Sequence, residues 1–115
     1  MTRFALHSTI RADAIDDYVA QHRRIPDDLQ GVFDRVGVID WVIWRSGDRL
    51  FHLVDCDDID DVMRRIGESP ENEAWQRDIG RFVSRFHGPD GQDDAAPLAE
   101  VWALSTQRQD ERRRP

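Results

Sequence analysis

The sequence predicts one α+β domain built on an antiparallel sheet. The chain has 115 residues, which is the size of a single domain. Segments in which apolar and polar residues alternate indicate strands, and segments with apolar residues three and four positions apart indicate helices. Both kinds of segment follow one another along the chain with short turns between them. A chain of this length buries roughly two-thirds of its unfolded surface, enough for a core without disulfides.

The first third of the chain predicts a strand and two helices. Residues 3–10 alternate as in a half-buried strand. A helix is expected to begin at Asp13, because the acidic residues that follow suit the positive end of the helix dipole. Pro26 lacks an N–H and is expected to end or kink this helix. A second helix is expected over residues 27–36, with Gly37 as its C-terminal cap.

A β-hairpin and two further helices are expected next. Residues 38–44 and 49–56 are apolar runs joined by a turn that contains Gly47. The remaining elements expected are helices over 57–66 and 70–86, a polar loop over 87–97 and a final strand over 98–105. The order strand, helices, strand, strand, helices, strand is that of a split βαβ, or ferredoxin-like, arrangement.

We expect the domain to span residues 1–106. The Arg-rich segment 107–115 contains no apolar residue, so it is expected to be disordered.

One face of the expected sheet has no helices to cover it, and it is apolar. Ile39, Trp41 and Ile43 alternate with Val42 and Trp44, so both sides of this strand are apolar. Contiguous exposed apolar surface is rare on soluble monomers. The sequence therefore predicts a homodimer that packs two sheets together as a dimeric α+β barrel, with a concave site at each sheet.

Composition excludes several classes of function. The net charge of −7 disfavours nucleic-acid binding. All 16 basic residues are arginine, so lysine Schiff-base chemistry is excluded. The single cysteine, Cys56, excludes a disulfide framework and fits a reducing compartment. No apolar run is long enough to span a bilayer and no leader opens the chain, so we expect a cytoplasmic protein without a membrane partner.

Motifs for metals and nucleotides are not present in the sequence. There is no His-x-x-x-His and no Cys pair. The acidic run 55–61 lacks the glycine and glutamate of an EF-hand loop, and it more simply caps a helix. Glycine-rich phosphate loops and nucleophile-elbow serines are also missing. We therefore expect neither a metal ion nor a nucleotide.

Tyr18 and His22 form the first candidate pair for chemistry. Their spacing of four residues stacks them one turn apart on a helix face. A phenol and an imidazole placed this way can hydrogen-bond two oxygens of one small polar ligand; the alternative is a half-buried aromatic pair at a helix end. His7 and His52 could line the same concavity, whereas His87 is expected to be exposed in a loop. Of the four tryptophans, Trp44 and Trp102 are expected to be core material.

The run Asp17-Tyr18-Val19-Ala20-Gln21-His22, after a strand near the N-terminus, resembles the L-rhamnose mutarotase family. The resemblance covers about residues 3–105 and includes Leu29, Leu50-Phe51 and Glu100-Val101. It implies a cofactor-free dimeric α+β barrel that interconverts the α and β anomers of L-rhamnose or a related 6-deoxyhexose.

The resemblance also implies roles for individual residues. His22 corresponds to the proton donor, and Tyr18 to a residue that contacts the sugar. Trp41 stands where the family has a substrate-binding tyrosine. Trp75 matches the first of two adjacent substrate-binding tryptophans, and Gln76 replaces the second. Indole rings stack on the C–H faces of sugars, and an indole N–H supplies one donor.

The expected reaction opens the hemiacetal ring. The anomeric hydroxyl loses a proton while the ring oxygen gains one, and the aldehyde rotates and recloses. A histidine with a pKa near neutrality can give and recover such a proton. The base stays open at this point; the candidates are His7, Asp40, His52 and Glu100.

Two other functions remain open from the sequence. Arg23 and Arg24 replace the Asn-Pro that the family has after its histidine. This change and the missing tryptophan motivate a non-catalytic sugar-binding dimer. The same kind of fold also hosts cofactor-free monooxygenases, because a fold does not determine a function.

Overall fold

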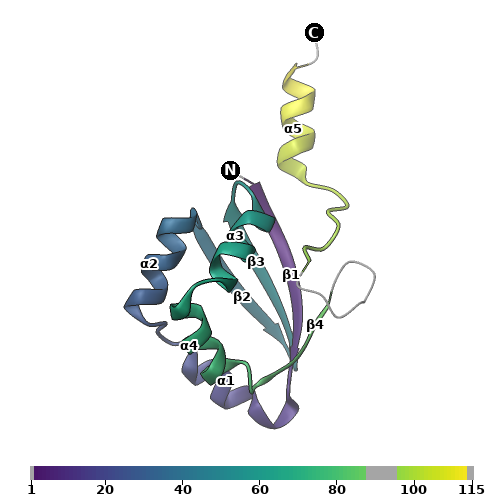
Figure 1. Ribbon diagram of the computed structural model, residues 1–115. Helices are drawn as coiled ribbons and strands as arrows, with labels where there is room; N and C mark the ends of the chain where they lie inside the picture. The colour runs from purple at the N-terminus through teal and green to yellow at the C-terminus, as the bar shows by residue number, and fades with distance from the viewer. Residues whose placement is uncertain (1, 88–95, 114–115) are drawn as a thin grey trace.

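The computed structural model describes residues 2–87 and 96–113. In these residues the chain forms a four-stranded antiparallel sheet with the order β2-β3-β1-β4, and helices lie in front of it in Figure 1. The elements in chain order are β1 (Thr2–Ile10), the 3-10 turn η1 (Ala12–Ala14), α1 (Ile15–Gln21), α2 (Asp27–Val36), β2 (Asp40–Ser46), β3 (Arg49–Cys56), α3 (Ile59–Gly67), α4 (Pro70–Ile79), β4 (Val83–His87) and α5 (Leu104–Arg113).

The sheet confirms the ferredoxin-like α+β fold predicted from the order of the elements. The central strand β1 pairs with β3 along most of its length and with β4 at its C-terminal end. Strands β2 and β3 form the expected hairpin, in which Gly47 has a φ of +59° that suits glycine. The helix over residues 27–36 has the predicted limits, and Gly37 caps it in the left-handed conformation.

The core lies between the sheet and the helices. Every second residue of β1, at positions 6, 8 and 10, is buried under the helices. Strand β3 contributes Leu50 and Val54 to the same layer. Helices α2, α3 and α4 close it with buried aliphatic side chains, namely Leu29, Val32, Val36, Ile59, Val62, Ile66 and Ile79. The two-residue period of the strands therefore decides which side chains can reach the helices.

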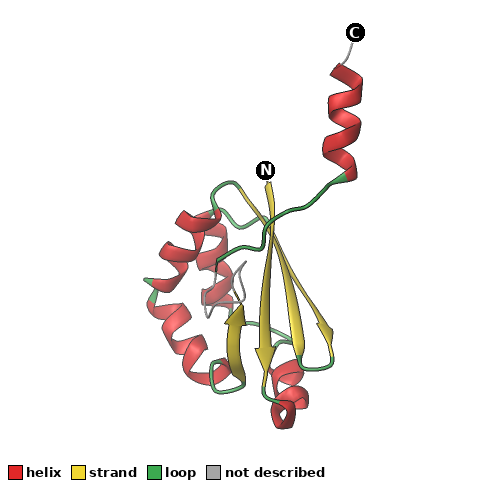
Figure 2. Cartoon of the chain, turned by 90° about the vertical axis from the view of Figure 1, so that its right-hand side faces the viewer, coloured by secondary structure: helices red, strands yellow, loops and turns green. Residues whose placement is uncertain are grey.

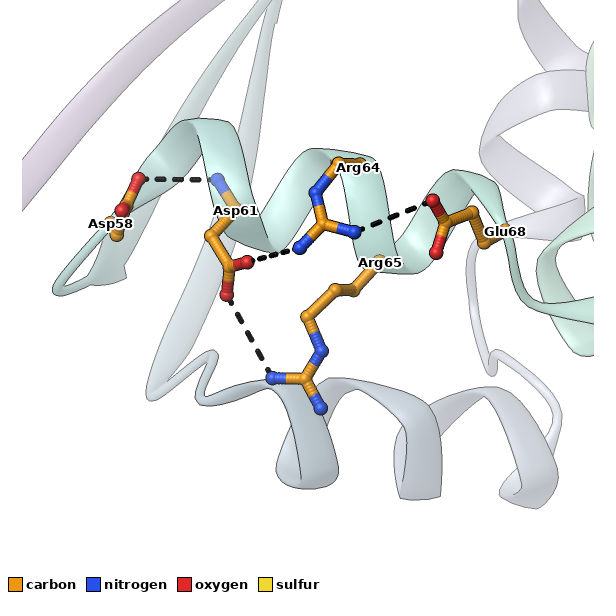
Figure 3. Close-up of polar contacts among 5 residues, drawn as sticks. All are labelled: Asp58, Asp61, Arg64, Arg65 and Glu68. Carbon is orange, nitrogen blue, oxygen red and sulfur yellow. Dashed lines mark hydrogen bonds and ion pairs between the residues drawn. The ribbon is translucent and has the colours of Figure 1, made fainter.

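Helix α3 begins at a side-chain cap and continues into a row of exposed ion pairs (Figure 3). The Oδ1 atom of Asp58 accepts the backbone N–H of Asp61 at 3.1 Å, which satisfies one free donor of the first turn. Arg64 bonds Asp61 at 2.6 Å and Glu68 at 3.4 Å. Solvent screens exposed pairs of this kind, so they stabilise the helix only weakly, and the acidic segment serves mainly to cap the start of α3.

The prediction of a helix over residues 70–86 is wrong for its second half. Helix α4 ends at Ile79, and Val83–His87 forms the edge strand β4. A Cβ at Gly80 would lie 2.5 Å from the backbone oxygen of Gln76, so the tight exit from α4 needs a glycine there. Beyond this turn, the backbone groups pair with β1. Apolar residues at three- and four-residue steps cannot reveal such pairing, because it depends on a distant strand.

The strand expected over residues 98–105 is also absent. Residues 98–103 have no regular structure, although the N–H of Leu98 bonds the oxygen of Ala5 at 2.8 Å. Helix α5 then projects away from the sheet (Figures 1 and 2), and it includes residues 107–113, where disorder was expected. Trp102 and Trp44 are exposed, so the prediction that they are core residues is wrong. Of the expected loop over 87–97, residues 88–95 lie outside the described chain.

Candidate active site

Aromatic and imidazole rings gather on the helix-covered face of the sheet. They come from three helices, the two strands of the hairpin and the edge strand. Their ring contacts, with centroids 4.1–6.1 Å apart, form two groups, Tyr18–His22–Trp75 and Phe33–Trp41–His52–Phe86. The groups lie near each other, because the charge of His22 lowers the pKa of His52. The rings are those of Tyr18, His22, Phe33, Trp41, His52, Trp75 and Phe86. We call these residues the ring cluster. It contains four of the five site residues expected from the sequence: Tyr18, His22 and Trp75 in one group and Trp41 in the other.

Tyr18 and His22 lie together at the end of α1, as their spacing predicts. Their ring centroids are 4.1 Å apart. The Nδ1 atom of His22 donates to the backbone oxygen of Tyr18 at 3.0 Å. The same oxygen accepts the backbone N–H of His22 at 3.2 Å, so main chain and imidazole of His22 both bond the last turn of α1. The imidazole bond places the proton of neutral His22 on Nδ1, so its Nε2 atom carries the lone pair that can take up a proton.

The surroundings of this pair shift both pKa values. Burial raises the pKa of Tyr18 far above its ordinary value, so the phenol stays protonated and remains a hydrogen-bond donor. Burial lowers the pKa of His22, and the bond to the Tyr18 carbonyl partly opposes this shift. The pKa of His22 therefore lies below its ordinary value of about 6.5, and the neutral form predominates at pH 7.

Helix α4 supplies the wall beside His22. Trp75 is buried, and its ring meets that of His22 edge-on, with centroids 5.2 Å apart and planes at 84°. Gln76 is exposed and does not join the ring cluster. Arg23 and Arg24 are exposed too, and Arg24 pairs with Asp27 at the start of α2.

Strand β2 supplies Trp41 to the same covered face. Its ring stacks on that of Phe33 of α2, with centroids 5.6 Å apart. Its Nε1–H donates to Nδ1 of His52 at 3.2 Å. His52 is 5% exposed, and its Nε2 bonds the hydroxyl of Ser8 at 3.0 Å. Burial, followed by the charges of His22 and His7, lowers the pKa of His52 to about 4, so His52 is neutral at pH 7.

The structure separates the four candidates for the base. His7 does not line the concavity that holds His22: it faces the opposite side of the sheet and stacks on Phe51 and His87, with centroids 4.8 and 4.5 Å away. Asp40 and Glu100 are exposed. His52 lies in the ring cluster, but both of its nitrogens are engaged in hydrogen bonds. None of these four residues therefore offers a free basic atom beside His22.

Other kinds of site have no support in the described residues. In this part of the chain, no group of three or more His, Cys, Asp or Glu side chains is placed to hold a metal ion. None of the helices that the structure describes is long and apolar enough to cross a bilayer. An open surface hollow of about 430 Å³ lies beside α1, lined by Asp17, Ala20, Gln21, Arg81 and Phe82, and none of these residues belongs to the ring cluster.

Solved structures with similar folds include enzymes of several activities. An L-rhamnose mutarotase from Formosa agariphila superposes with a TM-score of 0.71 at 16% identity, covering 90% of this chain and 99% of that one. Tetracenomycin F2 cyclase from Streptomyces glaucescens gives 0.57 at 17% identity, over 90% and 97% of the two chains. A putative antibiotic biosynthesis monooxygenase from Nitrosomonas europaea gives 0.53 at 11%, over 74% and 88%. These similarities show the fold.

The family is shown by the sequence as a whole. No curated protein matches the chain. The family model described as L-rhamnose mutarotase matches residues 3–104, which include all of the ring cluster and, apart from Thr2, every strand of the sheet. The chain therefore belongs to the L-rhamnose mutarotase family.

Proposed function

We propose that this protein interconverts the α and β anomers of L-rhamnose or a related 6-deoxyhexose by opening and closing the sugar ring. One observation carries the proposal within this family: the bond from Nδ1 of His22 to the Tyr18 carbonyl leaves Nε2 to exchange a proton. Tyr18 and Trp75 flank this imidazole. A phenol donor and an indole wall are the groups that a sugar ring needs for binding.

The proton route uses Nε2 of His22 in both directions. Nε2 takes the proton of the anomeric hydroxyl, the bond between the anomeric carbon and the ring oxygen breaks, and Nε2 gives the proton to the ring oxygen. The aldehyde rotates about its bond to the next carbon, and the reverse steps close the other anomer. Both oxygens are attached to the same carbon, so one nitrogen can serve both. His22 is then the proton donor without a second basic side chain.

Tyr18 and the two tryptophans hold the sugar in this scheme. The phenol of Tyr18 is protonated because burial raises its pKa, so it can donate to a sugar oxygen at any physiological pH. Trp75 and Trp41 supply flat apolar walls. Gln76, the next residue of α4 after Trp75, is exposed. The contribution of Gln76 to sugar binding stays a prediction.

The pH dependence of the enzyme tests the protonation state of His22. The scheme starts from neutral His22, whose pKa is lowered by burial. We therefore expect the enzyme-catalysed exchange rate to rise with pH through a midpoint below about 6.5 and then to level off. Saturation-transfer NMR over this range, after subtraction of the buffer-catalysed rate, measures it. A rate that falls with increasing pH would mean that protonated His22 is the reactive form.

The substrate is identified by an NMR screen of anomer exchange with L-rhamnose, L-fucose and common hexoses. Acceleration with a 6-deoxyhexose supports the proposal. Quenching of tryptophan fluorescence by a sugar without faster exchange would instead indicate a non-catalytic sugar-binding protein. Consumption of oxygen with an aromatic substrate would indicate the monooxygenase alternative. These three readouts separate the three functions.

We further propose that the protein works as a homodimer that packs the two open sheet faces together. Trp44 and Phe51 face each other across β2 and β3 on the side without helices, and they are 56% and 38% exposed. Val42 and Leu53 form the next pair along the same face. In a twofold-symmetric dimer, this apolar patch packs against the same patch of the second copy, so both patches are removed from water.

Trp44→Glu is expected to convert the dimer into a monomer, because the new carboxylate would be buried at the interface without a partner. Size-exclusion chromatography with light scattering measures the mass in solution. Gln30→Glu makes the same change of charge at an exposed position of α2 and is expected to leave the dimer intact. A Trp44→Glu protein with the mass of the wild type would contradict the proposed interface.

We also infer that the protein resides in the cytoplasm. Its one cysteine, Cys56, is buried and free, so the fold uses no disulfide, and this is typical of proteins from reducing compartments.

A further inference from the structure

We propose that Ser8, His52 and Trp41 form a hydrogen-bonded chain that positions the indole of Trp41, so that this tryptophan contacts the sugar through its ring and not through its N–H. This inference rests on the proposed function for its ligand. It adds Ser8 to the site, and it gives His52, which the sequence offered only as a lining residue or a candidate base, the role of a positioning residue.

The donors and acceptors of this chain have one consistent arrangement. An indole N–H can only donate, so Nδ1 of His52, 3.2 Å from Nε1 of Trp41, must accept. Neutral His52 then carries its proton on Nε2, which donates to the hydroxyl oxygen of Ser8 at 3.0 Å. Protonated His52 would have an N–H at both nitrogens, and one of them would face the N–H of Trp41. The arrangement therefore requires neutral histidine.

The sheet and the helices that cover it bury this hydrogen-bonded group of side chains. Leu6 lies directly opposite His52 in the pairing of β1 with β3, and Ser8 is the diagonal neighbour of His52 on the same face. Ser8 and His52 are both buried under the helices. The pKa of His52, about 4, keeps it neutral over the physiological range. A buried polar network whose members are paired fixes side chains more firmly than exposed hydrogen bonds do.

Trp41 is thus held from two directions. Phe33 stacks on its ring with planes 26° apart, and His52 holds its N–H. The indole N–H is already used inside the protein, so it is not available to a sugar oxygen. Trp41 offers apolar surface only, and Tyr18 and His22 supply the polar contacts. Trp41 is a specificity-determining wall, and His52 and Ser8 are positioning residues.

The first test is spectroscopic and needs no sugar. The spectrum of ¹⁵N-labelled wild type is compared with that of ¹⁵N-labelled Trp41→Phe protein. The indole N–H signal that disappears is that of Trp41, one of the four tryptophans. We expect His52→Ala to shift this signal, and His52→Gln to restore it, because an amide can accept from Trp41. Acidification should move the wild-type signal with a midpoint near pH 4, and His52→Gln should remove this step. An unchanged Trp41 signal in folded His52→Ala protein would contradict the hydrogen bond from Trp41 to His52.

The second test measures the effect on the sugar. We expect His52→Ala to raise KM about tenfold, roughly the value of one hydrogen bond, and to leave kcat within about twofold, because His22 is untouched. Ser8→Ala should act in the same direction with a smaller effect. If the protein accelerates anomer exchange of no sugar while the indole signals behave as expected, the proposed function is wrong and the hydrogen-bonded arrangement of Ser8, His52 and Trp41 is supported. If the protein accelerates anomer exchange but His52→Ala leaves KM unchanged, the proposed function is supported and the positioning role of His52 is wrong.

Discussion

Replacing His22 by alanine is expected to lower the enzyme-catalysed rate of anomer exchange by about 10²- to 10⁴-fold, the usual contribution of a general acid–base group. The reason is that Nε2 of His22 holds the exchanged proton, and none of the candidates His7, Asp40, His52 and Glu100 offers a free basic atom beside it. Saturation-transfer NMR with L-rhamnose measures the rate directly at equilibrium.

The matched control is Gln21→Ala, which removes a side chain from the same helix end but outside the ring cluster. It is expected to leave the rate within about twofold of the wild type. Circular dichroism and thermal unfolding show whether each variant is folded. His22 is half-buried and caps α1 through backbone bonds, so His22→Ala is expected to fold. A folded His22→Ala protein with the wild-type exchange rate would refute the assignment of the proton donor.

Leu6→Ala is expected to lower the free energy of unfolding by about 2–5 kcal/mol, because it leaves a cavity at the centre of the sheet. Leu6 is 1% exposed on the helix-covered face of the central strand, directly opposite His52. A loss of this size is a large part of the roughly 5–15 kcal/mol that stabilises an ordinary domain.

Urea denaturation followed by circular dichroism measures this change. Val19→Ala provides the control, because Val19 of α1 is 43% exposed and surface truncations usually change stability by less than about 0.5 kcal/mol. A loss below about 1 kcal/mol for Leu6→Ala would contradict the placement of this residue in a packed core.

The elements that depend on local interactions were predicted well. Helix α2 has the predicted limits, because acidic residues begin it and a left-handed glycine ends it. The hairpin turn is likewise determined by neighbouring residues. Tyr18 and His22 meet because residues four apart on a helix share a face whatever the rest of the fold does.

The predictions that failed depend on contacts between distant residues. The segment after Gly80 became a strand because it pairs with the edge of β1. His7 was one candidate for lining the concavity of His22, yet it lies on the open face. Alternation along a strand shows which residues share a face, but it does not say which of the two faces the helices cover.

By itself, the sequence determined the α+β class, the first three strands and the Tyr18–His22 pair, because local periodicity and capping specify them. It placed the fourth strand at residues 98–105, whereas that strand is Val83–His87. Only the tertiary structure decided that His52 joins Trp41 and that His7 does not. The pairing of β1 with β3 puts His52 opposite the core residue Leu6 and leaves His7 on the other side of the sheet. Packing brings together side chains from different strands and helices, and the spacing of residues along the sequence does not show which of them will meet.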